Sequence, residues 1–517
     1  MASTALTDDA YLIGLDVGTT GAKAVLINST GRVLGEATRE YPLSTPRPNW
    51  SEQDPADWHV ASVGAIRDVL AGAEIDPRHV VALGLTGQMH GATLLDADGA
   101  PLRPAILWND QRTAAQCDEI TRRVGAERVM RLTGNPVLTG FTAPKVLWVR
   151  EHEPEIYSRI ASLLLPKDYV RFCLTGARFS DVTDASGASL FDVAQRRWSD
   201  EMLEPAGVRR EWLPEVTESP VVSARLSADG GRATGLLAGI PVVAGAGDQA
   251  AQAIGAGILS EGAVSVTIGT SGVVFAACDE YRVEPHGKLH AFCHAAPGKW
   301  HLMGVMLSAG GSLRWYRDCL CAAEQAEAAA ANIDAYERIL APASAAPAGC
   351  EGLLFLPYLT GERTPHADPD ARGAFVGLTL RHTKAHLTRA VLEGVAFGLR
   401  DSLELMRGLG TRIESLRVSG GGARSALWRQ ILADVFDHAL ETPSPNQGAA
   451  FGAALLAGVG ARVFESVEAA CRRAVRATPA ATPGRDAATY ARVYERFCAL
   501  YPALAAEFRA YGAASCE

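Results

Sequence analysis

Apolar residues near the start of the chain come in runs separated by short polar turns. YLIGLDV (11–17), AKAVLIN (22–28) and RVLGEATREY (32–41) are rich in β-forming residues, and the turns between them contain GTTG and STG. Short apolar runs broken by glycine turns indicate strands joined as hairpins. The pattern therefore predicts a meander of strands at the beginning of the protein.

The same arrangement returns about half a chain later. AVSVTIGTSGVVFAAC (263–278) again places a Gly-Thr-Ser-Gly turn between two apolar strands, and the offset between the two turns is 269 − 18 = 251 residues. A single short match can arise by chance, but a period of this length is too long for a solenoid and suggests two related domains. We place the boundary near residue 258, which predicts domains over 11–258 and 259–517.

Strand and helix signals alternate through both halves, which is the pattern of an α/β fold. VVALGLTG (80–87) is typical of a strand, 384–409 of a helix, and 416–436 of a strand, a glycine loop and a helix. The Ala-rich segment 322–348 predicts a helix followed by a polar loop. Residues after 461 continue with helical periodicity and carry no chemistry that the sequence identifies.

Composition narrows the function classes. The 517 residues contain 49 Lys and Arg against 58 Asp and Glu, a net charge of −9, which argues against nucleic acid as a partner. No apolar run reaches the roughly 20 residues of a membrane span, and residues 1–10 are acidic and predict a disordered lead-in, not a signal peptide. The ten cysteines have no CxxC spacing, which favours reduced thiols and a cytoplasmic location.

Three glycine-rich turns each follow a strand. In Asp16-Val-Gly-Thr-Thr-Gly-Ala-Lys23, glycine amides, threonine hydroxyls and a lysine could hold a phosphate, although a tight hairpin with a surface lysine explains the same residues. The GTSG turn (269–272) allows the same two interpretations. In SGGGARS (419–425) three glycines precede a helix, which favours close approach of a nucleotide.

The sequence lacks one common nucleotide-binding motif and matches another. No GxxxxGK[ST] occurs, which excludes a P-loop NTPase. Gly245-Ala-Gly-Asp-Gln-Ala250 fits GxGxx[G/A] and keeps a dinucleotide-dependent dehydrogenase open, but Asp248 would put a negative charge in the pyrophosphate loop. Asp248 instead suits a general base that accepts a proton from an attacking hydroxyl, or an N-cap for the following helix.

Two polar turns have the composition of a site for a small polyhydroxylated ligand. Gln88-Met89-His90 lies between glycines at the end of a predicted strand, and Trp108-Asn109-Asp110-Gln111-Arg112 combines an aromatic ring with polar groups. A structural histidine and an ordinary turn with surface charges are the competing interpretations.

Together these residues resemble the FGGY family of carbohydrate kinases over nearly the whole stretch from Tyr11 to about Gly460. One family signature is matched by GFTAPKVLWVREH (140–152), and a second runs from GAFVGL (373–378) to Glu393. WSEQDP (50–55) and GERTP (361–365) also look like family segments, and we interpret them as packing around the cleft.

The resemblance implies two ribonuclease-H-like domains of the actin and hexokinase type, flanking a central cleft, with ATP and Mg²⁺ as cofactors. Carried over to this chain, Asp248 would be the catalytic base and Asp16 would act on Mg²⁺ through water. The residues implied on the ATP side are Thr19, Thr20, Lys23, Thr270, Gly311, Gly421, Gly422 and Ala423. Those implied on the sugar side are Gln88, Met89, His90, Asn109, Asp110, Asp248 and Gln249.

The implied activity is ATP-dependent phosphorylation of D-xylulose at its 5-hydroxyl. Met89 and His90 match the xylulose-binding turn of the family, whereas its glycerol kinases carry an Arg-Glu pair there, so glycerol is disfavoured. Gln249 departs from the asparagine of many xylulose-specific members, which keeps another ketose or a polyol open. An actin-like or chaperone-like ATPase is the alternative from a different class. The expected partners are sugar and ATP, without nucleic acid or membrane, and a homodimer is left open.

Overall fold

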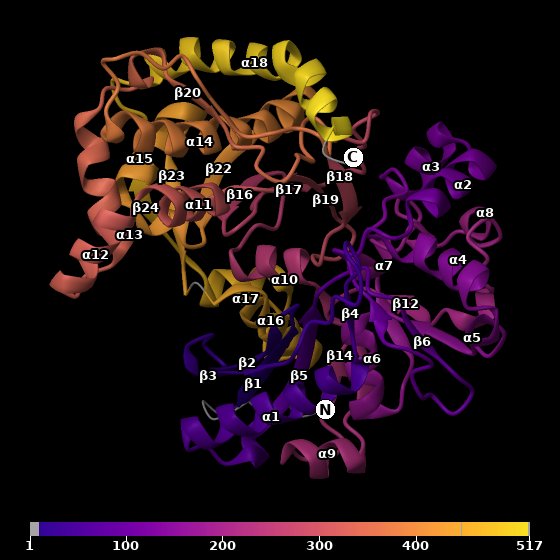
Figure 1. The fold of residues 1–517 in the computed structure, drawn as a ribbon. Coiled ribbons are helices and arrows are strands. Elements are labelled where there is room, and N and C mark those ends of the chain that lie inside the picture. Colours follow the sequence, from indigo (N-terminus) through magenta and orange to yellow (C-terminus); the bar gives the residue numbers. More distant parts are fainter. Residues whose placement is uncertain (1–9, 446, 515–517) are drawn as a thin grey trace.

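The computed structural model describes residues 10–445 and 447–514 and has two lobes with three helices between them (Figure 1). These helices are α10 (Asp248–Gly255), α16 (Gly448–Gly460) and α17 (Val467–Ala474). Residues 1–9 of the expected lead-in lie outside the described residues, and Ala10 is buried at the start of the first strand. In the described part of the chain, every helix is too short or too polar to cross a bilayer.

The first lobe is built on a seven-stranded sheet with the order β13-β14-β5-β1-β2-β3, and β15 also pairs with β5. β1, β2 and β3 form an antiparallel meander, whereas β5 and β14 run parallel to β1. The strands are β1 (Tyr11–Val17), β2 (Gly21–Asn28), β3 (Val33–Glu40), β5 (Val80–Gly87), β13 (Val222–Arg225), β14 (Pro241–Val243) and β15 (Ala246–Gly247).

The second lobe repeats this plan in a sheet with the order β18-β19-β17-β16-β22-β23-β24. β16, β17 and β19 form the meander, and β22 and β23 continue parallel to β16. The strands are β16 (Gly262–Ile268), β17 (Gly272–Cys278), β18 (His290–Cys293), β19 (Trp300–Met306), β22 (Ile413–Ser419), β23 (Leu440–Ser444) and β24 (Arg476–Ala481). Each Gly-Thr turn thus joins the first two strands of its sheet, and the meanders differ from the mostly parallel sheet of a dinucleotide-binding domain.

Helices cover both faces of the first sheet, which explains why apolar residues of β1 point to both sides. Ile13 packs with Trp58 of α1 on one face, and Leu12 packs with Ala450 of α16 on the other. α1 begins at Pro55, where the Asp54 side chain accepts a hydrogen bond from the Ala56 amide and caps the helix. The helices of the first half, besides α10, are α1 (Pro55–Ala73), α2 (Ala114–Val124), α3 (Ala126–Thr133), α4 (Thr142–His152), α5 (Pro154–Ser158), α6 (Pro166–Thr175), α7 (Val182–Ser186), α8 (Asp200–Leu203) and α9 (Ala228–Thr234).

Short strands and helices complete the two lobes. The remaining strands are β4 (Glu52–Gln53), β6 (Thr93–Leu95), β7 (Ala105–Ile106), β8 (Ser162–Leu164), β9 (Phe179–Asp181), β10 (Phe191–Asp192), β11 (Arg197–Trp198), β12 (Glu215–Thr217), β20 (Leu354–Leu356) and β21 (Ala374–Val376). The helices of the second half, besides α16 and α17, are α11 (Gly310–Leu320), α12 (Ala322–Ala331), α13 (Ala335–Leu340), α14 (Lys384–Gly408), α15 (Ala426–Phe436) and α18 (Ala487–Ala514).

The Ala-rich segment differs from its prediction. Instead of one helix and a polar loop, it forms α12, α13 and a 3-10 turn over Ala341–Ala345. Asn332 takes a left-handed conformation that ends α12, and the Asp334 side chain then caps α13 by accepting from the Tyr336 amide. The composition concealed this break because alanine favours helix on both sides of it.

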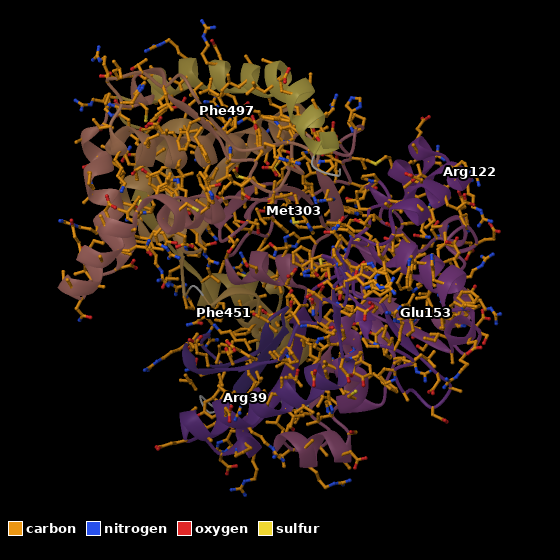
Figure 2. The ribbon with its side chains drawn as sticks, in the orientation of Figure 1. Arg39, Arg122, Glu153, Met303, Phe451 and Phe497 are labelled. Atoms are coloured by element: carbon orange, nitrogen blue, oxygen red, sulfur yellow. The ribbon has the colours of Figure 1, made fainter. Side chains whose placement is uncertain are left out.

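α16 belongs to the second half of the sequence but packs on the first sheet. Its apolar residues share a core with β1, β2 and α10, and Phe451 lies between the lobes (Figure 2). Glycines allow this close approach: a Cβ at Gly14 would lie 1.8 Å from the Ala450 carbonyl oxygen, and one at Gly84 would lie 2.1 Å from that of Ala453. The two lobes are therefore joined by crossing helices, and the division at residue 258 stays a prediction.

Candidate active site

A cavity of about 600 Å³ lies where the two lobes meet, and residues from both sheets line it. Asp16 and Lys23 come from the first sheet, and Asp248 and Gln249 from α10. The second lobe contributes residues around the triple glycine. Its lining residues are Asp16, Lys23, Asp248, Gln249, Gln252, Thr267, Val418, Ser419, Gly420, Gly421, Ala423, Arg424, Thr442, Gln447, Gly448 and Ala449. Turns far apart in the sequence therefore meet in one cavity.

Asp248 is the first residue of α10 and follows the short strand β15. Its Oδ1 accepts a hydrogen bond of 2.7 Å from the Gln249 amide, and Gly247, not Asp248, occupies the N-cap position. Desolvation deep in the cavity raises the pKa of Asp248 to about 6, although the Gln249 amide works in the opposite direction. The Asp248 carboxyl group therefore titrates at about pH 6.

Asp16 and Lys23 face Asp248 from the β1–β2 hairpin. Asp16 Oδ1 is buried without a hydrogen-bond partner, and burial together with the charge of Asp248 raises the pKa of Asp16 to about 7. Lys23 lowers that pKa, while its Nζ contacts Glu36 Oε2 at 2.7 Å and Gln447 Oε1 at 3.0 Å. An unpartnered carboxylate oxygen in a cavity is a plain acceptor for a hydrated cation. Among the described residues, no group of three or more His, Cys, Asp or Glu side chains forms a metal site.

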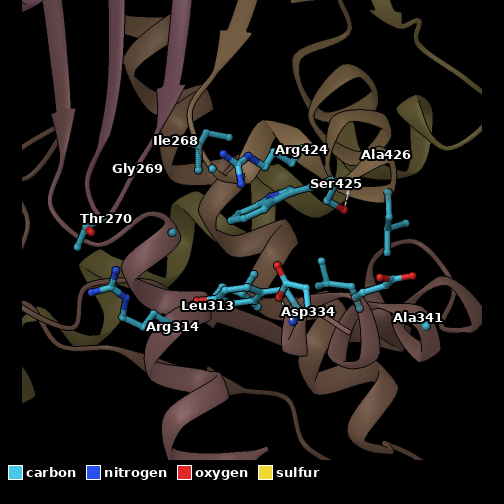
Figure 3. A pocket seen from close by; sticks show the side chains of 18 of the residues that line it. Ile268, Gly269, Thr270, Leu313, Arg314, Asp334, Ala341, Arg424, Ser425 and Ala426 are labelled. Carbon is cyan, nitrogen blue, oxygen red and sulfur yellow. Dashed lines mark hydrogen bonds between the residues drawn. The ribbon is translucent and has the colours of Figure 1, made fainter. Parts of the chain in front are cut away.

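A second cavity, of about 810 Å³, continues from the first into the C-terminal lobe, and Gly421 and Arg424 line both (Figure 3). Thr270 and Gly422, two of the residues expected on the ATP side, are on its wall. Gly311 lies next to the lining residue Gly310 and donates its amide hydrogen to the Thr270 carbonyl at 2.9 Å. A largely apolar cavity that opens onto glycine turns suits a nucleotide.

Sequence reasoning missed much of this second cavity. Asp334, Tyr336, Glu337 and Leu340 come from α13 and the residue that caps it, in the Ala-rich segment that had no predicted role. Trp428 of α15 closes another side, buried with its Nε1 donating to the Leu392 carbonyl. The charged and aromatic residues of DAYERIL (334–340) are a signal that could have separated this segment from the alanines before it.

The turn at 87–91 follows β5 and has an unusual backbone. His90 has a φ of 71°, in the left-handed region that non-glycine residues rarely adopt. Its carbonyl accepts hydrogen bonds from Thr142 Oγ1 at 3.1 Å and from Lys145 Nζ at 2.9 Å. Both donors lie on α4, so the signature at 140–152 has a physical role: it holds the polar turn in place.

The His90 ring has a defined protonation state. Its Nδ1 lies 2.6 Å from the Gly187 carbonyl oxygen, and the ring stacks on Phe141 with centroids 4.4 Å apart. Burial lowers the pKa of His90 to about 3, so the ring is neutral. Because a carbonyl can only accept, the hydrogen is on Nδ1, and Nε2 is left as an acceptor.

Hydrogen bonds join this turn to the predicted phosphate turn. Thr19 Oγ1 donates to Gln88 Oε1 at 3.2 Å and accepts from Trp108 Nε1 at 2.9 Å. The buried Gln53 spans both turns: its Nε2 donates to the Thr19 carbonyl at 2.7 Å, and its Oε1 accepts from Gln88 Nε2 at 2.9 Å. Thr20, by contrast, is exposed. The WSEQDP segment therefore couples two site turns, a role that the sequence did not reveal.

Met89 places the same turn beside Asp248. A Cβ at Gly247 would lie 2.8 Å from Met89 Sδ, so the methionine packs against the residue that precedes the carboxylate. Met89 is almost fully buried. The polar turn and the start of α10 are consequently in direct contact.

Asn109 and Asp110 occupy different environments. Asp110 is fully buried, and its carboxylate accepts from the Ser51 amide at 2.6 Å and pairs with Arg112 at 2.7 Å. The Arg112 guanidinium lies 3.6 Å from the Trp50 ring centroid. Asn109 Oδ1 is buried without a protein partner. Asp110 thus stabilises the turn through buried contacts, and Asn109 Oδ1 is a free hydrogen-bond acceptor.

Family models match most of the chain. The FGGY family of carbohydrate kinases, N-terminal domain, matches residues 11–255, and the C-terminal domain of the same family matches residues 264–461. The chain belongs to the FGGY family of carbohydrate kinases, which use ATP to phosphorylate sugars. The predicted family and two-domain fold are confirmed, and the match sets aside the dehydrogenase and actin-like ATPase alternatives.

Similar proteins extend over nearly the same length. A protein named xylulose kinase from Escherichia coli K12 is 44% identical over 456 residues, which are 88% of this chain and 91% of that protein. One of the same name from Bacillus subtilis 168 is 39% identical over 466 residues, 90% of this chain and 91% of that protein. A solved structure described as a xyloylose kinase from Brucella ovis is 40% identical, with a TM-score of 0.87 and coverage of 96% of this chain and 99% of that chain.

Proposed function

We propose that this protein transfers the γ-phosphoryl group of ATP to the 5-hydroxyl of D-xylulose, with Asp248 as the general base. The observation that carries the proposal is the position of Asp248, deep in the cavity that Asp16 and the glycine loop at 420–421 also line. A carboxylate there can meet a hydroxyl on one side and a phosphate on the other. The names of the relatives at 39–44% identity support xylulose as the sugar.

Phosphoryl transfer asks the protein mainly for positioning and for charge stabilisation. Asp248 accepts the hydroxyl proton while the sugar oxygen attacks the γ-phosphorus. Its pKa near 6 leaves it ionised at neutral pH yet basic enough to take that proton. Lys23 lines the same cavity and supplies positive charge there.

Mg²⁺ fits the residues present. Asp16 Oδ1 is the unpartnered oxygen that would hold the ion through a water molecule, and Mg²⁺ is commonly bound by one or two carboxylates together with substrate phosphates. Once bound, the ion would offset the negative charge of the phosphate oxygens.

The proposed sugar site contains hydrogen-bond acceptors that have no partner among the described residues. His90 Nε2 and Asn109 Oδ1 are acceptors that sugar hydroxyls can donate to. Trp108 is partly exposed and adds an aromatic surface next to the turn, where its Nε1 donates to Thr19. We place ATP in the larger cavity, with its phosphates pointing toward Gly421 and Arg424. A homodimer and a cytoplasmic location stay predictions.

The test measures ADP release by the wild-type protein and by Asp248→Asn with Mg-ATP and a panel of sugars. The panel contains D-xylulose, D-ribulose, L-ribulose, xylitol and glycerol, with a no-sugar control. We expect strong stimulation of the wild type by D-xylulose, and a kcat for Asp248→Asn that is lower by about 10²–10⁴-fold because the base is lost. Asparagine keeps the acceptor for the Gln249 amide, so ATP binding, measured by calorimetry, should persist.

Asp192→Asn is the matched control, since Asp192 is buried on β10 and accepts from the Gln195 amide outside both cavities. It should leave kcat unchanged. Near-normal turnover by Asp248→Asn would remove the base assignment. Preference for another sugar would correct the substrate, and equal ADP release with and without sugar would overturn the proposal.

A further inference from the structure

The short helix α7 lies next to both the catalytic carboxylate and the polar turn. At its start, Thr183 Oγ1 accepts a hydrogen bond of 2.8 Å from the Gly247 amide, one residue before Asp248. Directly after its end, the Gly187 carbonyl accepts the hydrogen of His90 Nδ1. One turn of helix therefore holds a neighbour of the base at one end and the histidine at the other.

Thr183 has no freedom to rotate its hydroxyl. The hydroxyl donates to Asp181 Oδ2 at 2.5 Å, which leaves a lone pair of its oxygen to accept from the Gly247 amide. The same carboxylate oxygen accepts from the Thr183 amide at 2.8 Å and caps the helix. Thr183 and Asp181 are both fully buried, which keeps water from competing for these bonds.

A buried cluster of ion pairs holds α7 in place. Lys167 Nζ lies 2.6 Å from Asp168, 2.8 Å from Asp181 and 3.2 Å from Asp184, and all four side chains are inaccessible to solvent. Asp181 caps α7 and Asp184 lies within it, so the ammonium ties this helix to α6. Burying these charges costs free energy that apolar side chains in the same place would not cost, so the cluster indicates a role other than stability.

The end of α7, the turn at 87–91 and the start of α10 pack closely together. A Cβ at Gly187 would lie 2.5 Å from His90 Cε1 and 2.9 Å from Met89 Cε, and one at Gly247 would lie 2.8 Å from Met89 Sδ. Met89 is thus enclosed between the end of α7 and the start of α10. A displacement of α7 would therefore disturb the contacts that hold both His90 and the start of α10.

We propose that α7 sets the position of Asp248 relative to His90, with Thr183 as a positioning residue that acts through the Gly247 amide. The inference rests on the proposed role of Asp248 as the base. A shift of about 1 Å in a reacting group can lower the rate about 10²-fold. Loss of the hydrogen bond between Thr183 and the Gly247 amide should therefore lower the rate.

The test compares Thr183→Val, which keeps the shape and removes the hydroxyl, with Thr183→Ser, which restores it. We expect kcat to fall about ten- to hundredfold in Thr183→Val and to recover to within about threefold of wild type in Thr183→Ser. The KM for ATP should not change, because the nucleotide cavity lies in the other lobe. Thr234→Val is the matched control: Thr234 is equally buried and bonds the Gly230 carbonyl in α9, and its loss should leave kcat as in wild type.

The double variant with Asp248→Asn separates the two hypotheses. If Thr183 acts only through Asp248, adding Thr183→Val to Asp248→Asn should leave the residual rate unchanged. A wild-type kcat in Thr183→Val, or a full additional loss in the double variant, would overturn the positioning role. A near-normal rate in Asp248→Asn alone would instead refute the base assignment, whatever Thr183→Val does.

Discussion

At the scale of single residues, the cleft is defined by groups whose charge is set by their surroundings. Asp16 and Asp248 share one cavity, and burial raises the pKa of both, to about 7 and about 6. His90 is pushed the other way, to about 3, by the same desolvation. The cavity therefore holds two carboxylates that change protonation between about pH 6 and 7, whereas the His90 ring stays neutral there.

These shifts predict the pH dependence of the reaction. A base works only when deprotonated, so kcat/KM for the sugar should fall about tenfold per pH unit below about pH 6, with no further limb from His90 above pH 4. The stability of the folded protein changes with pH in the opposite direction to the rate. The folded chain keeps the Asp248 proton longer than the unfolded chain, so this group lowers the free energy of unfolding as pH rises from about 4 to 6.

Asp248→Asn removes that titration, so its stability relative to wild type should increase with pH over the same interval. Urea unfolding of both proteins at several pH values, beside the rate profile, provides the measurement. A rate that stays flat down to pH 4.5 would contradict the shifted pKa.

The sequence revealed the residues whose chemistry is local and missed those whose partners are distant. Asp248 and the glycine turns stood out because each follows a strand. Thr183 gave no signal, and Gln53 and Lys145 appeared only within family-like segments without a role. Their partners Gly247, Gln88 and His90 are 64, 35 and 55 residues away. Spacing along the chain carries no information about contacts that depend on how a sheet and its helices come together.

At the scale of elements, the C-terminal helix α18 shows what the tail after residue 461 does. Its Tyr490 is fully buried, donates to Glu393 Oε1 at 2.6 Å and accepts from Arg389 at 2.7 Å. Arg389 and Glu393 lie on α14, the long helix of the second lobe. Sequence periodicity predicted the helix, but the hydroxyl that docks it could not be distinguished from other tyrosines.

Removing that hydroxyl should destabilise the second lobe without affecting catalysis. Tyr490→Phe removes two hydrogen bonds, one to each member of the buried ion pair, and a bond to a charged group contributes about 1.5–3 kcal/mol. We expect a loss of that size in urea unfolding, with kcat within about twofold of wild type. Tyr157→Phe is the control, since its hydroxyl bonds only the Gly207 carbonyl at a half-buried site. Equal stabilities of the two variants would refute the docking role.

At the scale of the whole molecule, the two similar sheets work as one enzyme because helices cross between them. α10 carries Asp248 out of the first lobe, and α16 returns from the second lobe to pack on β1 and β5. The offset of the two Gly-Thr turns predicted a pair of related sheets. It could not predict this return, because an Ala- and Gly-rich helix such as α16 fits against either sheet by composition alone.

The contact between α10 and α16 predicts how the lobes are coupled to the site. A Cβ at Gly452 of α16 would lie 1.8 Å from the Ala251 carbonyl oxygen and 3.1 Å from the Gly255 amide, and both are backbone atoms of α10 that cannot rotate away. Gly452→Ala must therefore push the helices apart. Overpacking of this kind costs about 1–3 kcal/mol of stability, and kcat should fall as well because α10 carries Asp248.

Gly72→Ala supplies the control for that experiment. Gly72 lies in α1, and a Cβ there would meet no atom within 4 Å, so alanine should raise stability by up to about 1 kcal/mol through helix propensity alone. Urea unfolding and kcat measured on both variants separate the two effects of adding one methyl group. If Gly452→Ala were as stable and as active as wild type, α16 would not fix the position of α10, and the placement of Asp248 would depend on the first lobe alone.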